Sequence, residues 1–284
     1  MIRRIVIPVR GDGKGDNVFA HAVAVAGRFD AQVVVTHCRA RAEDMMPYGV
    51  PIPASMKKLL LSQSAELADQ VEDNLKKELE VLAKRLNIDI VEGYVAGKSS
   101  ATWVEEQGRQ VDVIKRHGRL ADLICVAKPD VDRNLGANTL KAALFNTGRP
   151  VMMCPGSESF PESLCDRIAI AWNGSMEASR AVALSGPILE RASQVSILCS
   201  GPEVDGAGAD ALKEFLRIRG IQAEINRFDA KRKIGQALLS ESVSAGADTL
   251  IMGAYSNSHE RETVFGGTTQ YIVDKAQSPV IFVH

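Results

Sequence analysis

Short apolar runs alternate along the chain with longer segments in which apolar residues recur every three or four positions. Within the 284 residues these runs predict strands near 3–9, 32–37, 88–95, 122–127 and 150–154, and again near 167–172, 194–199, 221–228, 248–253 and 279–283. Runs that are apolar throughout are typical of a parallel sheet covered by helices on both faces. The pattern therefore predicts an α/β fold with two tandem doubly wound domains, each with a five-stranded parallel sheet flanked by helices.

The chain also repeats three landmarks in the same order. The pairs are Arg4-Ile5-Val6-Ile7 with Arg167-Ile168-Ala169-Ile170, Ala121-Asp122 with Ala247-Asp248, and Arg149-Pro150-Val151 with Ser278-Pro279-Val280. A polar, turn-rich segment, 156–163, separates the copies. We therefore expect one domain at 1–156 and a second at 164–284, and the shortness of the connection predicts that the two halves pack against each other.

A long helical pattern follows the second predicted strand. Its apolar positions share one face and are Leu67, Val71, Leu75, Leu79, Leu82 and Leu86. We interpret this face as packing onto the sheet. A role in binding a partner is the alternative.

Composition narrows the function classes. Hydrophobic residues make up 45% of the chain, and 34 basic residues face 35 acidic ones. This balance gives no positive field for a polyanion, so we expect no nucleic acid partner. No stretch reaches the roughly 20 apolar residues of a membrane span, and the five cysteines are scattered. We expect a soluble cytoplasmic protein with reduced cysteines, no metal site and no membrane insertion.

Candidate chemistry lies at strand exits of the second half, because ligands of open parallel sheets bind beyond the carboxyl ends of strands. Trp172-Asn173-Gly174-Ser175 follows the first strand, and Gly253-Ala254-Tyr255-Ser256 follows the fourth. Gly266-Gly267-Thr268-Thr269 opens the last helix, where free N–H groups and the helix dipole favour a phosphate. A plain turn with a helix cap explains the same four residues equally well.

The spacing Gly253-x-x-Ser256, nine residues, Gly266-Gly267-Thr268-Thr269 resembles the phosphate loop of the universal stress proteins, and the doubled architecture resembles their tandem members. The resemblance covers essentially the whole chain and implies strand order 3-2-1-4-5 in each half. It also implies that ATP or AMP, with or without Mg²⁺, binds in the C-terminal half. The implied nucleotide-binding residues are Ala171, Trp172, Asn173, Gly174, Ser175, Met252, Gly253, Ser256, Gly266, Gly267, Thr268 and Thr269.

The sequence departs from the family pattern at three positions. Ser256 stands in place of the second glycine, Asn173 where many members have aspartate, and Gly267 at a serine or threonine position. The first half departs further: Ala127-Lys128-Pro129-Asp130 lacks the strand-exit glycine. We therefore expect the first half to bind no nucleotide and to act as the built-in partner of the second.

Binding is favoured over catalysis. The chain contains no lysine between Gly253 and Thr269 that would hold transferring phosphates, no GxSxG and no HExxH. The sequence thus predicts a regulatory universal stress protein that binds an adenine nucleotide. A scaffold without a nucleotide and a slow ATPase are the alternatives, and the two halves either satisfy each other or pair again into a homodimer.

Overall fold

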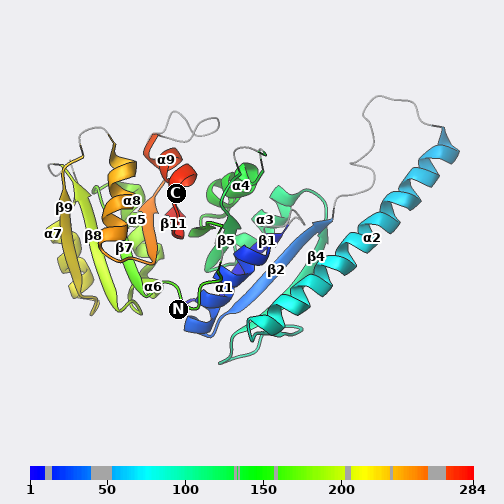
Figure 1. The fold of residues 1–284 in the computed structure, drawn as a ribbon, viewed down its shortest axis with the longest axis horizontal. Coiled ribbons are helices and arrows are strands. Elements are labelled where there is room, and N and C mark those ends of the chain that lie inside the picture. The colour runs from blue at the N-terminus through cyan, green and yellow to red at the C-terminus, as the bar shows by residue number, and fades with distance from the viewer. Residues whose placement is uncertain are drawn as a thin grey trace.

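The computed structural model describes residues 1–9, 15–39, 53–130, 133, 135–156, 159–201, 206–230, 233–254 and 267–284, without the side chains at 57, 61 and 64. Within these ranges the strands form a single 11-stranded sheet with helices on both faces (Figure 1). The α/β class that the apolar runs predicted is confirmed.

The strands, in chain order, are β1 (Arg4–Val9), β2 (Gln32–Arg39), β3 (Asp89–Ile90), β4 (Ser100–Gln107), β5 (Leu123–Ala127), β6 (Val151–Cys154), β7 (Arg167–Ala171), β8 (Gln194–Ser200), β9 (Ala223–Phe228), β10 (Thr249–Gly253) and β11 (Val280–Val283). Their order across the sheet is β3-β4-β2-β1-β5-β6-β11-β10-β7-β8-β9. Neighbours pair in parallel except β6 and β11, which pair antiparallel with Met152 opposite Ile281. Apart from the additional edge strand β3, the order 3-2-1-4-5 therefore recurs on each side of this junction, with β4 and β9 as the third strands.

The third strand of the first half corrects the sequence prediction. The run 88–95 contributes only the two exposed residues of β3, because the left-handed turns at Gly93 and Gly97 (φ 82° and 73°) carry the chain away from the sheet. The main third strand is β4, whose eight residues pair with β2. Its outer half is partly exposed and polar, so it lacks the continuous apolar run that marks the buried central strands such as β1 and β5.

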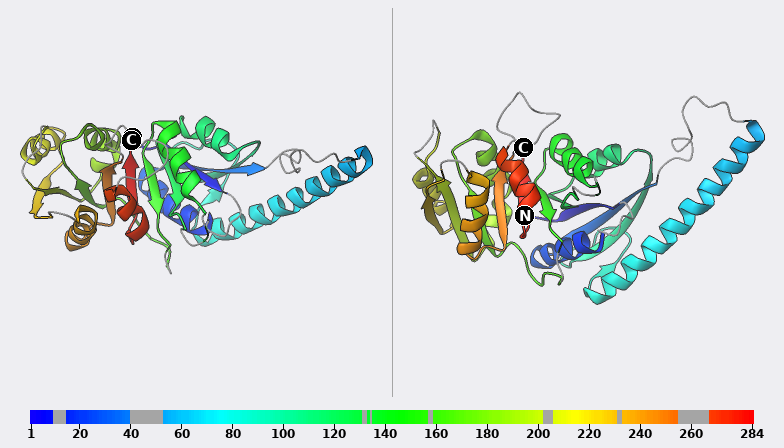
Figure 2. Two further views of the ribbon diagram at one scale, coloured as in Figure 1. Left: turned by 90° about the horizontal axis from the view of Figure 1, so that it is seen from above. Right: turned by 45° about the horizontal axis from the view of Figure 1, so that its top comes forward.

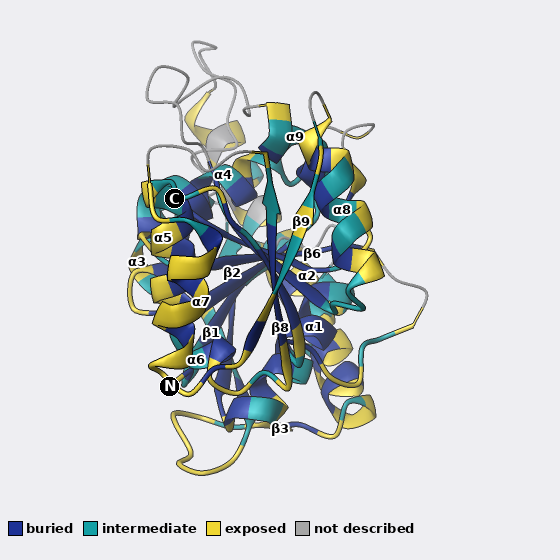
Figure 3. Ribbon diagram, turned by 90° about the vertical axis from the view of Figure 1, so that its left-hand side faces the viewer, coloured by how far each residue is buried: buried dark blue, intermediate teal, exposed yellow. Residues whose placement is uncertain are grey.

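The helices are α1 (Gly15–Phe29), α2 (Ala54–Arg85), α3 (Gln110–Gly118), α4 (Ala137–Thr147), α5 (Met176–Leu184), α6 (Gly186–Leu189), α7 (Ala209–Arg217), α8 (Ile234–Ser244) and α9 (Gly267–Lys275). Figure 3 shows buried strands between the helices of the two faces. Two core clusters fill the layers between the sheet and these helices. One packs α1, α2, α5, α6 and α7 onto strand residues such as Ile5 and Ile170. The other packs α3, α4, α8 and α9 onto the alternate strand residues, such as Val6 and Ala169.

Side chains also cross the junction between the halves. Arg28 of α1 forms an ion pair with Asp166 at 2.6 Å, and the guanidinium of Arg191 lies 5.2 Å from the ring centroid of Phe29. On the opposite face, Lys128 Nζ donates a hydrogen bond of 2.9 Å to the carbonyl oxygen of Ala276. The halves are therefore joined by the β6–β11 pair and by polar contacts on both faces.

Helix α2 extends beyond the edge of the sheet (Figures 1 and 2). Its C-terminal part packs as predicted, with Leu79 and Leu82 buried, whereas Leu67 and Val71 are 62% and 50% exposed. The packing interpretation of this apolar face is thus wrong for its N-terminal part. No helix among the described residues is both long enough and apolar enough to cross a membrane.

Candidate functional site

The exits of β7 and β10 lie side by side, because Ala171 is paired with Met252 in the parallel register. Beyond Ala171 the chain turns and enters α5, and two local hydrogen bonds stabilise this turn. Asn173 Oδ1 accepts from the Ser175 N–H at 3.1 Å, and Ser175 Oγ accepts from the Ala178 N–H at 3.2 Å. The Asn173 side chain and the Ser175 hydroxyl therefore organise the start of α5.

Trp172 and Gly174 contact the loop that follows β8. Trp172 is buried, and its indole Nε1 donates to the carbonyl oxygen of Ala207 at 2.8 Å. Gly174 has φ 75°, and a Cβ at Gly206 would meet Gly174 O at 2.5 Å. Both glycines are required by this backbone contact, so one side of the β7 exit is already closed by protein.

Gly253 ends β10 against the first turn of α5. A Cβ at this position would lie 2.6 Å from both Ala178 N and the carbonyl carbon of Glu177. Because backbone atoms cannot give way as a flexible side chain does, only glycine fits. Helix α5 is thus the element that approaches Gly253 closely. The preceding residue, Met252, is buried and anchors the end of β10 in the core.

The beginning of α9 is not covered by any other described residue. Gly267 is exposed, and a Cβ there would meet no described atom within 4 Å. Thr268 is half-buried and Thr269 is buried. Since α9 connects the parallel strands β10 and β11, it begins at the same edge of the sheet as the exit of β7. Ser256 and Gly266, the other two predicted loop residues, lie outside the described residues.

The corresponding loop of the first half folds onto itself. Asp130 and Leu135 exchange backbone hydrogen bonds of 2.9 and 3.0 Å. A Cβ at Gly136, which has φ 85°, would lie 3.3 Å from Pro129 Cα. Pro129 therefore occupies space directly beside the start of α4.

Metal-binding side chains do not gather in the described part of the chain. No three His, Cys, Asp or Glu side chains among the described residues are placed to hold a metal ion. Burial raises the pKa of the Cys165 thiol to about 12, which keeps it protonated and unreactive at neutral pH.

Two glycines with structural roles were missed in the sequence. Gly206 allows the β8–α7 loop to touch Gly174, and a Cβ at Gly235 in α8 would lie 3.0 Å from Tyr271 and 3.2 Å from Thr268 O. Gly235 thus lets α8 support the first turn of α9. An isolated glycine inside a helical pattern was the available signal for Gly235. For Gly206, the loop sequence gave no comparable signal.

Three solved structures share this architecture over nearly the whole chain, and two of them are described as universal stress proteins. The chain aligns with a universal stress protein from Archaeoglobus fulgidus DSM 4304 at 15% identity and a TM-score of 0.68, over 99% of this chain and 97% of that one. It aligns with a protein assigned as a universal stress protein from Pseudomonas aeruginosa UCBPP-PA14 at 16% identity, TM-score 0.55, over 99% and 93%. A functionally unknown protein from Pseudomonas aeruginosa PAO1 gives 15% identity, TM-score 0.56, over 99% and 92%.

These alignments span nearly the full length of each chain. The protein therefore has the fold of the universal stress proteins in a tandem arrangement. No protein-family model and no curated protein matches the sequence.

Proposed function

We propose that the chain is a regulatory universal stress protein that binds an adenine nucleotide, ATP or AMP, in its second half. The proposed site comprises Ala171 to Ser175 at the β7 exit, Met252 and Gly253 at the β10 exit, Ser256 and Gly266, and Gly267 to Thr269 at the start of α9. Mg²⁺ would accompany ATP there. The buried free thiols of Cys125, Cys154 and Cys165 support a reducing compartment such as the cytoplasm.

The observation that carries the proposal is the open start of α9 beside two strand exits. The first N–H groups of an α-helix have no partner within the helix, and the helix dipole places partial positive charge there. Among the described residues, nothing lies within 4 Å of the position a Cβ at Gly267 would take, so this side of the first turn is uncovered by them. Thr268 adds a hydroxyl. This combination suits a phosphate group.

Thermal denaturation with ATP, ADP and AMP tests the proposal. A nucleotide at 100 times its dissociation constant stabilises the folded state by about 2.7 kcal/mol, which raises the melting temperature by several degrees. Trp172 offers a second readout, since a ligand at the β7 exit would alter the Trp172–Ala207 contact. With Trp103→Phe as the background, emission reports Trp172 alone. No thermal shift and no fluorescence change at millimolar nucleotide would refute the proposal.

Gly267→Glu locates the site. A Cβ at this position meets no described atom within 4 Å and a carboxylate suits the helix dipole, so we expect the fold to be kept. Repulsion of phosphate by the carboxylate should weaken nucleotide binding at least about tenfold. The matched control is Ala137→Glu, at the equivalent position of α4 in the first half. If Ala137→Glu removes the thermal shift and Gly267→Glu does not, the nucleotide binds in the first half instead.

We also propose that residues 1–156 and 164–284 are the two domains, and that the first completes the second rather than binding nucleotide. The self-closed loop from Asp130 to Leu135 and the contact between Pro129 and Gly136 support this role. Phosphate release from ATP at a measurable rate would favour a slow ATPase. If the folded chain bound no adenine nucleotide, a scaffold without a nucleotide would be favoured.

A further inference from the structure

The N-terminal part of α2 presents an apolar stripe that no other described element covers. Met56 is 56% exposed, Leu67 62% and Val71 50%. At 100° per residue these three and Leu60 lie within about 60° of the helix circumference. Beyond Val71 the same face continues through Asn74 and Glu78.

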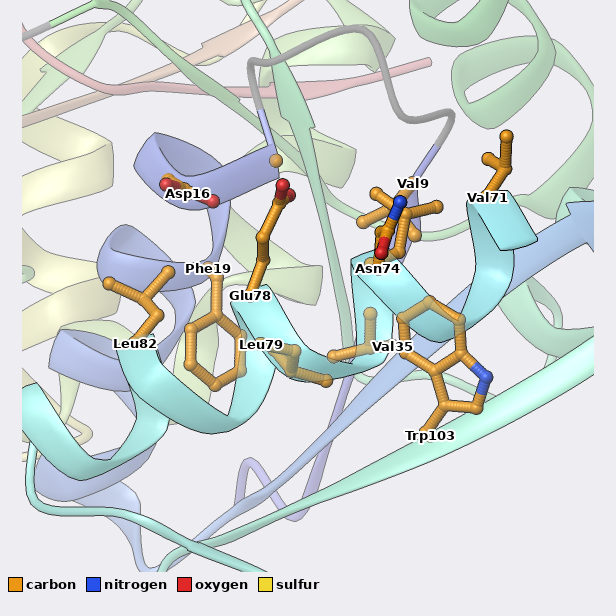
Figure 4. A pocket seen from close by; sticks show the side chains of 12 residues that line it. Val9, Asp16, Phe19, Val35, Val71, Asn74, Glu78, Leu79, Leu82 and Trp103 are labelled. Atoms are coloured by element: carbon orange, nitrogen blue, oxygen red, sulfur yellow. The ribbon is translucent and has the colours of Figure 1, made fainter.

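This stripe leads into a cavity of about 290 Å³ between α2 and the sheet. Val71, Asn74 and Glu78 line its outer side, and Phe19, Leu79 and Trp103 lie deeper (Figure 4). Val71 therefore belongs both to the stripe and to the lining of the cavity. Side chains of this size gain about 1.5–3 kcal/mol each when fully buried, which favours a partner here.

The N-terminus of α2 lacks local stabilisation. Pro53 stands at the N-cap and makes no side-chain capping hydrogen bond, and the first turn contains no acidic residue. The free N–H groups and the positive end of the dipole are thus left without an acceptor from the helix itself. A partner that packs on the stripe and brings an oxygen acceptor to this end would bury the apolar side chains and also cap the helix.

We propose that a second copy of the chain occupies this stripe, with its own α2 running antiparallel. In an antiparallel pair centred between Gln63 and Ser64, Met56 of one copy faces Val71 of the other, and Leu60 faces Leu67. The apolar residues of one stripe therefore meet those of the other. The same pairing brings Pro53 of one copy to Asn74 of the other. Glu78 follows four residues, or about 6 Å, further along.

The charge distribution decides among the geometries and occupants. An antiparallel pair puts the amide oxygen of Asn74 and the carboxylate of Glu78 near the uncapped end of the other helix, whereas a parallel pair puts two positive helix ends together. The helix carries six basic and six acidic residues and no aromatic residue. A helix that lies on an anionic membrane is instead rich in basic and aromatic residues. This composition favours a protein helix over a membrane surface as the occupant.

Analytical ultracentrifugation of the full chain tests the proposal without nucleotide. An interface of this few apolar residues belongs to the small, weak class, so we expect a reversible dimer that dissociates in the micromolar range. Leu67→Glu and Val71→Glu should each raise the dissociation constant at least about tenfold. Val81→Glu is the matched control: Val81 is 70% exposed on the same helix but lies about 15 Å beyond Val71.

Thiol cross-linking tests the direction of the pair. Met56→Cys and Val71→Cys should cross-link to each other when mixed, and each should cross-link poorly with itself. The unsubstituted chain is the control for Cys38 and Cys199, which are half-buried. Self-cross-linking of both variants would overturn the antiparallel geometry. A chain that stays monomeric at high concentration, or a dimer that Leu67→Glu and Val71→Glu leave intact, would overturn the proposal, as would binding of the stripe to anionic vesicles instead.

Discussion

Gly253 has a structural reason to be glycine that is separate from any ligand. Gly253→Ala would push a Cβ to 2.6 Å from the α5 backbone, so we expect the free energy of unfolding in urea to fall by about 1–3 kcal/mol. Gly186→Ala is the control, because a Cβ at Gly186 meets nothing within 4 Å. Its stability should change little. If Gly253→Ala kept full stability and lost only nucleotide binding, the glycine would serve the phosphate instead.

Asp248 explains why the Ala-Asp landmark recurs. Its carboxylate accepts backbone hydrogen bonds from Cys165, Asp166 and Arg167 at 2.8–3.0 Å, and Asp122 accepts equivalent bonds from Arg3 and Arg4. Asp248→Ala leaves these donors without a charged acceptor and should lower the free energy of unfolding by about 3 kcal/mol.

The control for Asp248→Ala is Asp89→Ala. Asp89 forms a surface ion pair with a 64% exposed side chain, and its removal should change stability by less than about 0.5 kcal/mol. Equal losses for both variants in urea titrations would contradict the structural role of the landmark.

At the scale of residues, the sequence identified which strand exits come together but not what each glycine contacts. Ala171 and Met252 are neighbours because both end parallel strands of one sheet. Spacing alone cannot distinguish a glycine that admits a phosphate from one that admits a helix, since both need a missing Cβ. In the sequence, Gly253 resembles a glycine that admits a phosphate. In the structure, its missing Cβ admits helix α5.

At the scale of the element, helix α2 contains both buried and exposed leucines. Leu79 is buried and Leu67 is exposed. We expect Leu79→Ala to lower the free energy of unfolding by about 2–5 kcal/mol through the cavity it leaves. Leu67→Ala, measured in dilute solution where the chain is monomeric, should change it by less than about 0.5 kcal/mol. A large loss for Leu67→Ala under these conditions would mean that the helix packs along its whole length.

The sequence predicted the apolar face of α2 but not where that face leaves the sheet. Helical periodicity reports which side of a helix is apolar, and it is the same for a covered and an uncovered turn. The misplacement of the third strand has a related origin. The partly exposed strand β4 gives a weaker apolar signal than the buried strands, although its eight residues all pair with β2.

At the scale of the whole molecule, the sequence predicted two repeated units and not the way they join. An apolar strand does not reveal its neighbour, and β6 and β11 have the composition of any buried strand. Their antiparallel pairing turns two sheet edges into the centre of one sheet. This arrangement removes two exposed edges, which would otherwise be free to pair with other chains.

The Arg28–Asp166 ion pair across the junction should make the coupling between the halves depend on pH. The hydrogen bond from the Ser193 hydroxyl and the ion pair with Arg28 hold the pKa of Asp166 below its usual value. A lowered carboxyl pKa stabilises the folded state above the unfolded pKa, about 3.9, and this contribution is lost as the pH falls through the folded value. Because Asp166 is 38% exposed, the coupling should amount to only about a few tenths of a kcal/mol.

A double-mutant cycle with Asp166→Asn and Arg28→Gln measures this coupling directly, since it removes effects that each substitution has on its own. The coupling free energy from urea titrations should be constant from pH 7 to about pH 5 and should decline between about pH 4 and pH 2. The hydrogen bond from Ser193 Oγ to Asp166, at 2.7 Å, contributes to the same shift. Ser193→Ala should therefore move the decline to higher pH, because it removes one of the two groups that favour the charged carboxylate. A coupling that stayed constant down to pH 2 would mean that it does not depend on the charge of the Asp166 carboxylate.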